Sequence, residues 1–313
     1  MVCKVCHNVQ DNKIHLVQER VLNNGKVFRY LECGRCKSWM MIDNVELSEC
    51  YPSNYNPYEK ESQNGCIDKI RNKILFEIII RLKHRVFPQV LQIEKFDILL
   101  KRMCGTRIKK NARILDVGCA NGIWLDEIYN MGWKNITGVD LYIPEEKMRH
   151  KKWRFVSGEI FDLYHEKYDF ISLNHSFEHM ENPLSVLKKI NDLLTDNGLC
   201  MISIPLVGGD AYVEFKEYYC QLDAPRHLYV LSKKAMRYLC RKAGLHIEYI
   251  SYDSNEGIYE LSEGYRKTNL SHGDLIRKPC ISSRKREEYK KRAYQSNITG
   301  KGDQAIFYIR KNK

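Results

Sequence analysis

The chain has 313 residues, of which 43% are hydrophobic and 29% charged, a composition typical of a folded globular protein. It contains no run of about 18 consecutive apolar residues, and its first residues lack the apolar centre of a signal peptide. We therefore predict neither a transmembrane helix nor secretion, and expect a cytoplasmic protein. The net charge of +12 falls mainly in two segments: residues 66–113 hold 13 Lys and Arg against 4 Asp and Glu, and residues 277–313 hold 12 against 3. We interpret both as solvated helix faces and a basic tail, with contact to nucleic acid or to an anionic membrane as alternatives.

Two C-x-x-C pairs, 26 residues apart, lie near the N-terminus and consist of Cys3, Cys6, Cys33 and Cys36. Four thiolates at this spacing suit a tetrahedral structural zinc ion, whose closed coordination leaves no position for a substrate. Residues 23–25 (Asn-Asn-Gly) separate two apolar runs and predict a hairpin, so residues 1–50 are predicted to form a zinc ribbon. A redox-active dithiol is the alternative, although such pairs usually occur singly on a β-α-β unit. The other eight cysteines are scattered and are expected to be small core residues in a reducing compartment.

The next part of the chain, residues 51–110, is predicted to be a linker followed by a basic helical segment. Residues 51–65 are rich in Tyr, Pro, Asn and Ser, as is typical of an ordered linker. In residues 67–104 the apolar positions recur at helical spacing, which predicts one or two helices broken near Pro88.

From residue 111 to the end, predicted strands alternate with helices. The strands are expected at residues 113–117, 136–139, 153–156, 168–173, 199–204, 245–252 and 304–310. Helices are expected to follow residue 122, to begin at Pro183, and to cover residues 232–243 before Gly244. This alternation predicts an α/β fold with a parallel sheet and helices on both faces.

The segment Ile-Leu-Asp-Val-Gly-Cys-Ala-Asn-Gly, residues 114–122, is the most informative of the chain. A buried strand ends in an acid, and a glycine turn then opens a helix whose first N–H groups are unpaired. About 20 residues later Asp140 ends the next strand, where a carboxylate can accept hydrogen bonds from ribose hydroxyls. A dinucleotide site would show G-x-G-x-x-G. The spacing here is G-x-x-x-G, and the acid, Asp116, suits the ammonium group of an amino-acid ligand better than a pyrophosphate.

This segment resembles motif I of the class I S-adenosylmethionine-dependent methyltransferases. Residues 138–140 (GVD), 157–160 (SGEI) and 176–183 (SFEHMENP) follow in the order of that family. The resemblance implies a Rossmann-like, seven-stranded sheet, mostly parallel with one antiparallel strand, over residues 111–313. Insertions are expected at about 205–231 and 253–303. S-adenosylmethionine is the implied cofactor.

The resemblance also implies the residues that bind this cofactor. The methionine part would lie against Asp116, Gly118, Cys119, Asn121 and Gly122. Asp140 would hold the ribose, with Leu141 beside the adenine, and Glu159 and Ile160 would lie near the adenine amine. Asn174 and His175 would close the pocket.

A methyltransferase acting on a hydroxyl group needs a general base. His175, His179 and His227 are the candidates, and His179 is favoured because it matches the histidine of the family's Glu-His pair; a purely structural histidine is the alternative. His175, Glu178 and His179 form a second alternative, a divalent-metal site. Residues 223–232 (DAPRHLYVLS) resemble a motif of methyltransferases that act on sugars and small molecules. By that resemblance Arg226 and His227 would face the acceptor, and Tyr218 and Tyr219 would form apolar walls. Glu178 is also predicted to contact the acceptor.

The similarity extends to bacterial methyltransferases encoded with glycan-assembly enzymes, through residues 30–44, 223–232 and 302–311. It implies O-methylation of a sugar, nucleotide-sugar or related precursor of a cell-surface polysaccharide. An rRNA or tRNA methyltransferase, a quinone-type small-metabolite O-methyltransferase and a non-catalytic binding protein are the alternatives. A small-molecule or glycan-precursor acceptor is expected, nucleic acid less so, and the oligomeric state is not fixed by the sequence.

Overall fold

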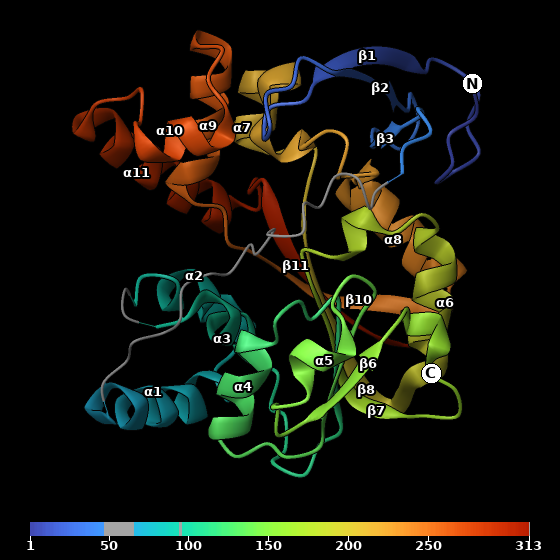
Figure 1. The fold of residues 1–313 in the computed structure, drawn as a ribbon, viewed down its shortest axis with the longest axis vertical. Helices are drawn as coiled ribbons and strands as arrows, with labels where there is room; N and C mark the ends of the chain where they lie inside the picture. Colours follow the sequence, from blue (N-terminus) through green and yellow to red (C-terminus); the bar gives the residue numbers. More distant parts are fainter. Residues whose placement is uncertain (47–65, 94–95, 313) are drawn as a thin grey trace.

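A computed structural model describes residues 1–46, 66–93 and 96–312 of the chain, and the predicted linker 51–65 lies outside the described residues. Two sheets organise the molecule. Figure 1 places the smaller, N-terminal sheet beside helices α7 (Asp210–Phe215), α9 (Glu256–Lys267), α10 (His272–Arg277) and α11 (Ser283–Thr299) at one end, and helices α1 to α5 at the other. Within the described residues, no helix is both long and apolar enough to cross a membrane.

The larger sheet has seven strands in the order β10-β11-β8-β7-β4-β5-β6. They are β4 (Ile114–Val117), β5 (Ile136–Asp140), β6 (Arg154–Ser157), β7 (Tyr168–Asn174), β8 (Leu194–Pro205), β10 (Leu245–Tyr252) and β11 (Gln304–Lys311). Only β11 runs against its neighbours, β8 and β10. The predicted mixed α/β fold, with a seven-stranded sheet and one antiparallel strand, is therefore confirmed.

Helices cover both faces of this sheet, as the alternation predicted. On one face lie α6 (Pro183–Leu193) and α8 (Lys233–Lys242), whose apolar residues share a core with the strands. On the other face lie α1 (Cys66–Ile79), α2 (Phe87–Val90), α3 (Ile98–Arg102) and α4 (Ile123–Asn130). Pro88 lies in the first turn of α2, so the predicted break comes before it. The short helices are α5 (Glu145–Met148), η2 (His84–Val86), η3 (Ile160–Asp162), η4 (Phe177–His179), η5 (Lys216–Tyr218) and η6 (Cys220–Leu222).

The N-terminal sheet contains β1 (Lys13–Gln18), β2 (Val27–Glu32) and β3 (Trp39–Met41). The hairpin expected around residues 23–25 is present, because β1 and β2 pair antiparallel on either side of it. The buried carboxylate of Glu19 orders this turn by accepting hydrogen bonds from the backbone N–H groups of Val21, Leu22 and Asn24. A fourth strand, β9 (Tyr229–Val230), comes from the insertion at 205–231 and pairs with β3.

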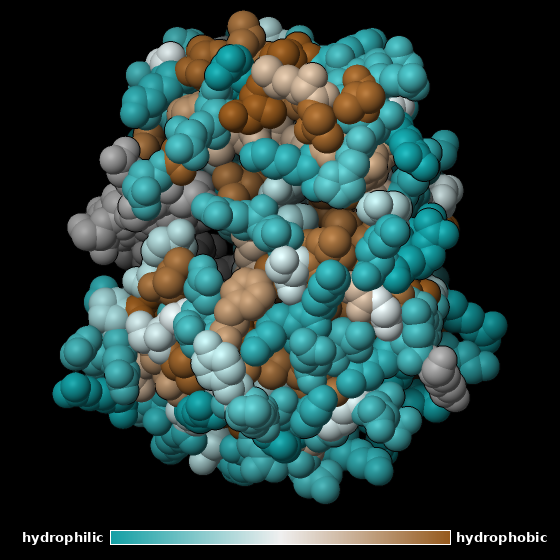
Figure 2. Space-filling view, turned by 90° about the vertical axis from the view of Figure 1, so that its right-hand side faces the viewer, coloured by the Kyte–Doolittle hydropathy of each residue, from teal (hydrophilic) through white to brown (hydrophobic). Residues whose placement is uncertain are grey.

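The N-terminal sheet packs between two parts of the chain beyond residue 111. Its cysteines and Leu31 belong to the core that contains α6 and α8, whereas Tyr30 and Trp39 pack against aromatic residues of α7, α9 and α11. Some apolar side chains of β1 and β2, among them Ile14 and Leu16, stay exposed. Figure 2 shows hydrophobic residues gathered at this end of the molecule.

Candidate cofactor and acceptor site

The loop after β4 has the backbone that its glycines predict. Gly118 and Gly122 adopt φ values of +74° and +70°, in the left-handed region that favours glycine. A Cβ atom on Gly118 would lie 2.5 Å from the Cβ of Ser176, in the segment that follows β7. The two loops at the carboxyl edge of the sheet therefore touch, and only glycine fits between them.

Asp140 ends β5 beside this loop. Its Oδ2 accepts a hydrogen bond from the Ala120 N–H and its Oδ1 from the Tyr142 N–H, each at 2.9 Å. The carboxylate thereby joins the loops after β4 and β5 and keeps further lone pairs for a ligand, as the ribose-binding prediction requires.

Asp116 lies one strand away, buried within β4. Its Oδ1 accepts a hydrogen bond from Ser172 Oγ at 2.7 Å and from Asn174 Nδ2 at 3.4 Å. Burial raises the pKa of Asp116 to about 7, with a smaller contribution from the charge of Asp140. This edge of the sheet therefore carries two carboxylates, of Asp116 and Asp140, close to each other.

The predicted adenine region lies beside Asp140. Leu141 is 51% exposed, and Tyr142 and Phe161 are also exposed, so apolar surface is available for a ring to cover. Ile160 is buried in the core, which leaves only its backbone for a ligand. Glu159 is exposed, and its backbone N–H donates to Asp162 Oδ2 at 2.8 Å. In the loop itself, Cys119 is buried, and Asn121 Oδ1 accepts a hydrogen bond from the Ile123 N–H at 3.3 Å.

Arg102, which the sequence analysis missed, reaches this site from α3. Its Nε donates to Asp253 Oδ2 at 2.7 Å, and its two terminal nitrogens donate to Asn174 Oδ1 at 3.4 Å and His175 Nε2 at 3.1 Å. Arg102 and Asp253 are both buried and lie 151 residues apart in the sequence. No local sequence pattern predicts such a pair.

The contacts of His175 argue against a role as general base. Because its Nε2 accepts from Arg102, its Nδ1 carries the proton and donates to Glu178 Oε1 at 3.2 Å. Burial alone would raise the pKa of Glu178, but the hydrogen bond from His175 and the charges of the nearby imidazoles outweigh it and hold the pKa at about 2. His175 thus links Arg102 to a carboxylate, with both ring nitrogens engaged.

His179 and His227 lie together, with ring centroids 4.8 Å apart. His179 Nδ1 donates to the Arg226 carbonyl and His227 Nδ1 to the Gln221 carbonyl, each at 2.8 Å, so the lone pair of each neutral ring is on Nε2. Burial, together with His227, lowers the pKa of His179 to about 4. His227 Nε2 lies 3.6 Å from Asp223 Oδ2 and 3.9 Å from Glu178 Oε1.

The residues that could bind a divalent metal differ in part from those predicted from the sequence. Glu178, His179 and His227 each place one potential ligand atom within 4.8 Å of the others. His227 takes the place of His175 in this set, and both ring nitrogens of His175 have hydrogen-bond partners.

Of the residues predicted to contact the acceptor, only some lie near the histidine pair. Arg226 donates to both oxygens of Asp223 at 2.7 Å, next to His227. Tyr218 is half-buried, and its ring lies 5.8 Å from the Arg20 guanidinium. Tyr219 packs in the core: the residue is 2% exposed, and its hydroxyl lies within hydrogen-bond distance of the Leu206 and Asp303 carbonyls, so its role as an acceptor wall stays a prediction.

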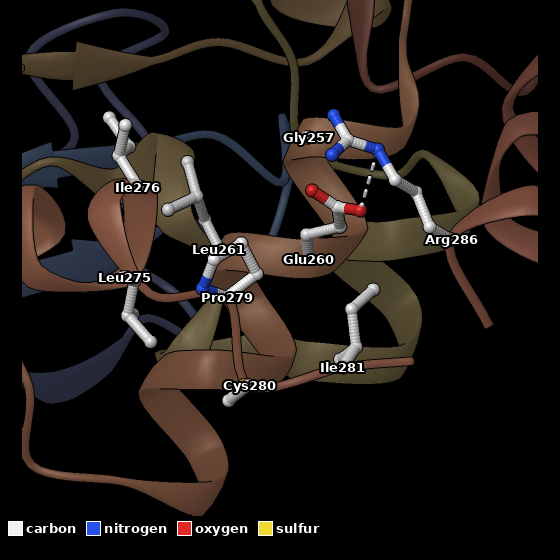
Figure 3. A pocket seen from close by; sticks show the side chains of 9 residues that line it. All are labelled: Gly257, Glu260, Leu261, Leu275, Ile276, Pro279, Cys280, Ile281 and Arg286. Carbon is white, nitrogen blue, oxygen red and sulfur yellow. Dashed lines mark ion pairs between the residues drawn. The ribbon is translucent and has the colours of Figure 1, made fainter. Parts of the chain in front are cut away.

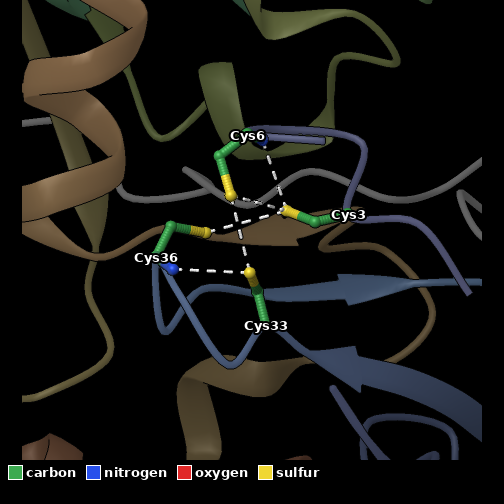
Figure 4. A group of neighbouring side chains, drawn as sticks. All are labelled: Cys3, Cys6, Cys33 and Cys36. Atoms are coloured by element: carbon green, nitrogen blue, oxygen red, sulfur yellow. Dashed lines mark hydrogen bonds between the residues drawn. The ribbon is translucent and has the colours of Figure 1, made fainter. Parts of the chain in front are cut away.

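The four N-terminal cysteines converge, as Figure 4 shows. Their sulfur atoms lie 3.6 to 3.7 Å apart along three contacts, and all four side chains are buried. The backbone N–H groups of Cys6 and Cys36 point at the sulfurs of Cys3 and Cys33, respectively.

Two hollows lie away from this site. One is a cavity of about 220 Å³ among α9, α10 and α11, where the Glu260–Arg286 ion pair faces aliphatic side chains (Figure 3). The other is a groove of about 620 Å³ that includes the amino ends of the strands, the edge opposite Asp140. It is lined by one carboxylate, Glu166, and five cations: Arg113, Lys134, Lys151, Lys152 and Arg154.

Several known proteins are similar to parts of this chain. Residues 88–250 match the family described as "Methyltransferase domain". The chain is 32% identical over 105 residues to the ubiquinone biosynthesis O-methyltransferase of Histophilus somni, covering 29% of this chain and 44% of that protein. It is 24% identical over 176 residues to the tRNA U34 carboxymethyltransferase of Sulfurimonas denitrificans, covering 53% and 58%. The chain thus spans about half the length of these curated relatives. A putative methyltransferase structure from Bacillus halodurans aligns with a TM-score of 0.45 and 15% identity, covering 68% of this chain and 97% of that one.

Proposed function

The chain belongs to the methyltransferase domain family, and on that premise we propose that it transfers the methyl group of S-adenosylmethionine to a hydroxyl group of a small molecule. One observation carries the proposal. Asp116, at the carboxyl edge of the sheet, connects through Asn174, Arg102, His175 and Glu178 to a histidine pair, and Asp140 lies beside the same loop. A site for a cationic cofactor therefore adjoins a site for proton removal.

The residues at the sheet edge fit the cofactor. Asp116 would pair with the ammonium group of its methionine part and Asp140 would accept hydrogen bonds from the ribose hydroxyls. The exposed side chains of Leu141 and Phe161 would cover the adenine. When bound, the cofactor supplies an electrophilic methyl group on a sulfonium centre, so the protein has only to orient the acceptor and remove its proton.

We assign the general base to His227 rather than to His179, the residue favoured by sequence. A base works best when its pKa lies near the operating pH, and a pKa of about 4 makes His179 a weak one. A proton taken by His227 Nε2 would lie beside two carboxylates, Asp223 and Glu178, which stabilise the imidazolium. The Nδ1–H bond to Gln221 holds the ring in the tautomer that can accept this proton.

The names of the similar proteins indicate which class of acceptor to test first. Their names, a ubiquinone O-methyltransferase and a tRNA U34 carboxymethyltransferase, favour the quinone-type and RNA alternatives over the polysaccharide precursor expected from the sequence. We therefore rank a phenolic or quinol hydroxyl first. The test is release of S-adenosylhomocysteine from S-adenosylmethionine with catechols and quinols, nucleotide sugars and tRNA in parallel. Turnover only with nucleotide sugars would restore the first expectation, and turnover with none of them would count against the proposal.

An RNA acceptor is the second candidate because of the groove lined by five cations. If RNA binds there, its affinity falls steeply with salt, since neutralising phosphates releases counterions. Charge reversal at Lys152 and Arg113 should then weaken binding, whereas a small-molecule enzyme would show no such change. Contact of the basic segments with an anionic membrane stays a prediction, and co-sedimentation with acidic liposomes at low salt tests it.

We further propose that the four cysteines hold one structural zinc ion. A tetrahedron with Zn–S bonds of about 2.3 Å has edges of about 3.8 Å, close to the observed sulfur separations of 3.6 to 3.7 Å. Metal analysis should give one zinc per chain, lost in Cys33→Ser. Disulfides in the purified, reduced protein in place of zinc would refute this assignment.

A further inference from the structure

The segment that carries His227 belongs physically to the N-terminal module, which we define as residues 1–46. β9 is the fourth strand of the module's sheet, with Tyr229 opposite Met40 and Val230 opposite Trp39. The Met41 N–H donates to the Leu228 carbonyl at 2.9 Å. A strand of two residues has little stability of its own, so the module determines where this segment lies.

The module also contacts His227 directly. Tyr30 of β2 is fully buried, and its hydroxyl donates to the His227 backbone carbonyl at 2.8 Å. On the other side, the Leu228 N–H donates to the Glu178 carbonyl at 3.0 Å. The backbone of residues 227 and 228 is thereby held between the module and η4.

The loop of the second cysteine pair is hydrogen-bonded to the C-terminal end of the same segment, at Ser232. Ser232 Oγ donates to the Cys36 carbonyl at 2.5 Å, and the Ser232 N–H donates to Ser38 Oγ at 2.9 Å. Ser232 also caps α8 by accepting from the Ala235 N–H. The chain from His227 to Ser232 is therefore bound to the module at both ends.

From these contacts we propose that the N-terminal module is part of the acceptor site and that Tyr30 is the residue that positions His227. The proposal rests on the assignment of His227 as general base. With its carbonyl fixed by Tyr30, the His227 imidazole reaches the Gln221 carbonyl with Nδ1 and holds Nε2 near Asp223. Because proton transfer depends on sub-ångström placement of the base, loss of this bond reduces turnover without touching the cofactor.

The test compares Tyr30→Phe with Tyr259→Phe as a matched control. Both tyrosines are fully buried in the same core, and Tyr259 bonds only to Ser296 among the described contacts. Three quantities are measured: the Kd for S-adenosylhomocysteine, the turnover with the acceptor found in the screen, and the ¹⁵N shifts of the His227 imidazole. We expect an unchanged Kd in both variants. In Tyr30→Phe alone, turnover falls about tenfold and the two His227 ring-nitrogen shifts converge as the tautomers mix.

His227 shifts and turnover that match the wild type in Tyr30→Phe would overturn the proposal. If Tyr30→Phe does not fold, Ser38→Ala, which removes the hydrogen bond that the Ser232 N–H donates to the module, should move the same shifts, and unchanged shifts there would also overturn it. The imidazole spectrum needs neither cofactor nor acceptor. A wild type that binds no cofactor therefore refutes the proposed function and still leaves the role of Tyr30 measurable.

Discussion

Cofactor binding should weaken as the pH falls through 7, because Asp116 must lose a proton to receive a cationic ligand. In the free protein burial holds the pKa of this carboxyl at about 7. An ammonium group beside it would pull the pKa down, so binding releases a proton, and the affinity is full above pH 7 and declines below it. At pH 6 about nine tenths of Asp116 is protonated, which costs about 1.4 kcal/mol and raises the Kd about tenfold relative to pH 8.

Titration calorimetry with S-adenosylhomocysteine, in buffers of different ionisation enthalpy, measures both the Kd and the proton count. Near one proton should be released per ligand at pH 6 and almost none at pH 8. Asp116→Asn should bind more weakly and lose this dependence. Equal affinity at the two pH values, with no proton released, would refute the placement of Asp116 against the ammonium group.

Three further outcomes follow from the site. His227→Gln should lower turnover about 100-fold or more with an unchanged cofactor Kd; such a loss in His179→Gln, but not in His227→Gln, would move the base to His179. Gly118→Ala should lower the unfolding temperature by several degrees, since a positive φ costs about 1 kcal/mol and its Cβ meets Ser176; a wild-type melting curve would contradict this contact. Adding Mg²⁺ or Mn²⁺ to dialysed enzyme should leave turnover unchanged, whereas stimulation would indicate an ion at Glu178 and its two histidine neighbours.

Most of the large sheet could be predicted from the sequence. Residues 114–117 and 168–173 are mostly apolar runs of strand length, and strands buried on both faces favour such runs. The turn at 118–122 and the acid at 140 could also be predicted. Glycines where the backbone needs a positive φ, and a carboxylate at the end of a strand, are visible in the local sequence.

Contacts between distant segments could not be predicted. Arg102 and Asp253 pair across 151 residues, and β9 is too short to show any periodicity. The choice between His179 and His227 depends on the carboxylates near each ring, which only the fold brings together. The burial of Tyr219 was unpredictable for the same reason, since the sequence of an insertion does not show whether a tyrosine faces a ligand or the core.

Titration of the zinc-loaded protein with S-adenosylhomocysteine tests the central claim most directly, on the wild type, Asp140→Ala and Asp169→Ala. Asp169 is the control because it also accepts a backbone N–H bond, from Arg113, but at the opposite edge of the sheet. Two charge-assisted bonds to ribose are worth about 3 kcal/mol or more together. We therefore predict micromolar binding by the wild type and Asp169→Ala, and a Kd at least about 100-fold higher for Asp140→Ala. A folded wild type that binds no cofactor, or an Asp140→Ala variant that binds as the wild type does, would contradict the account.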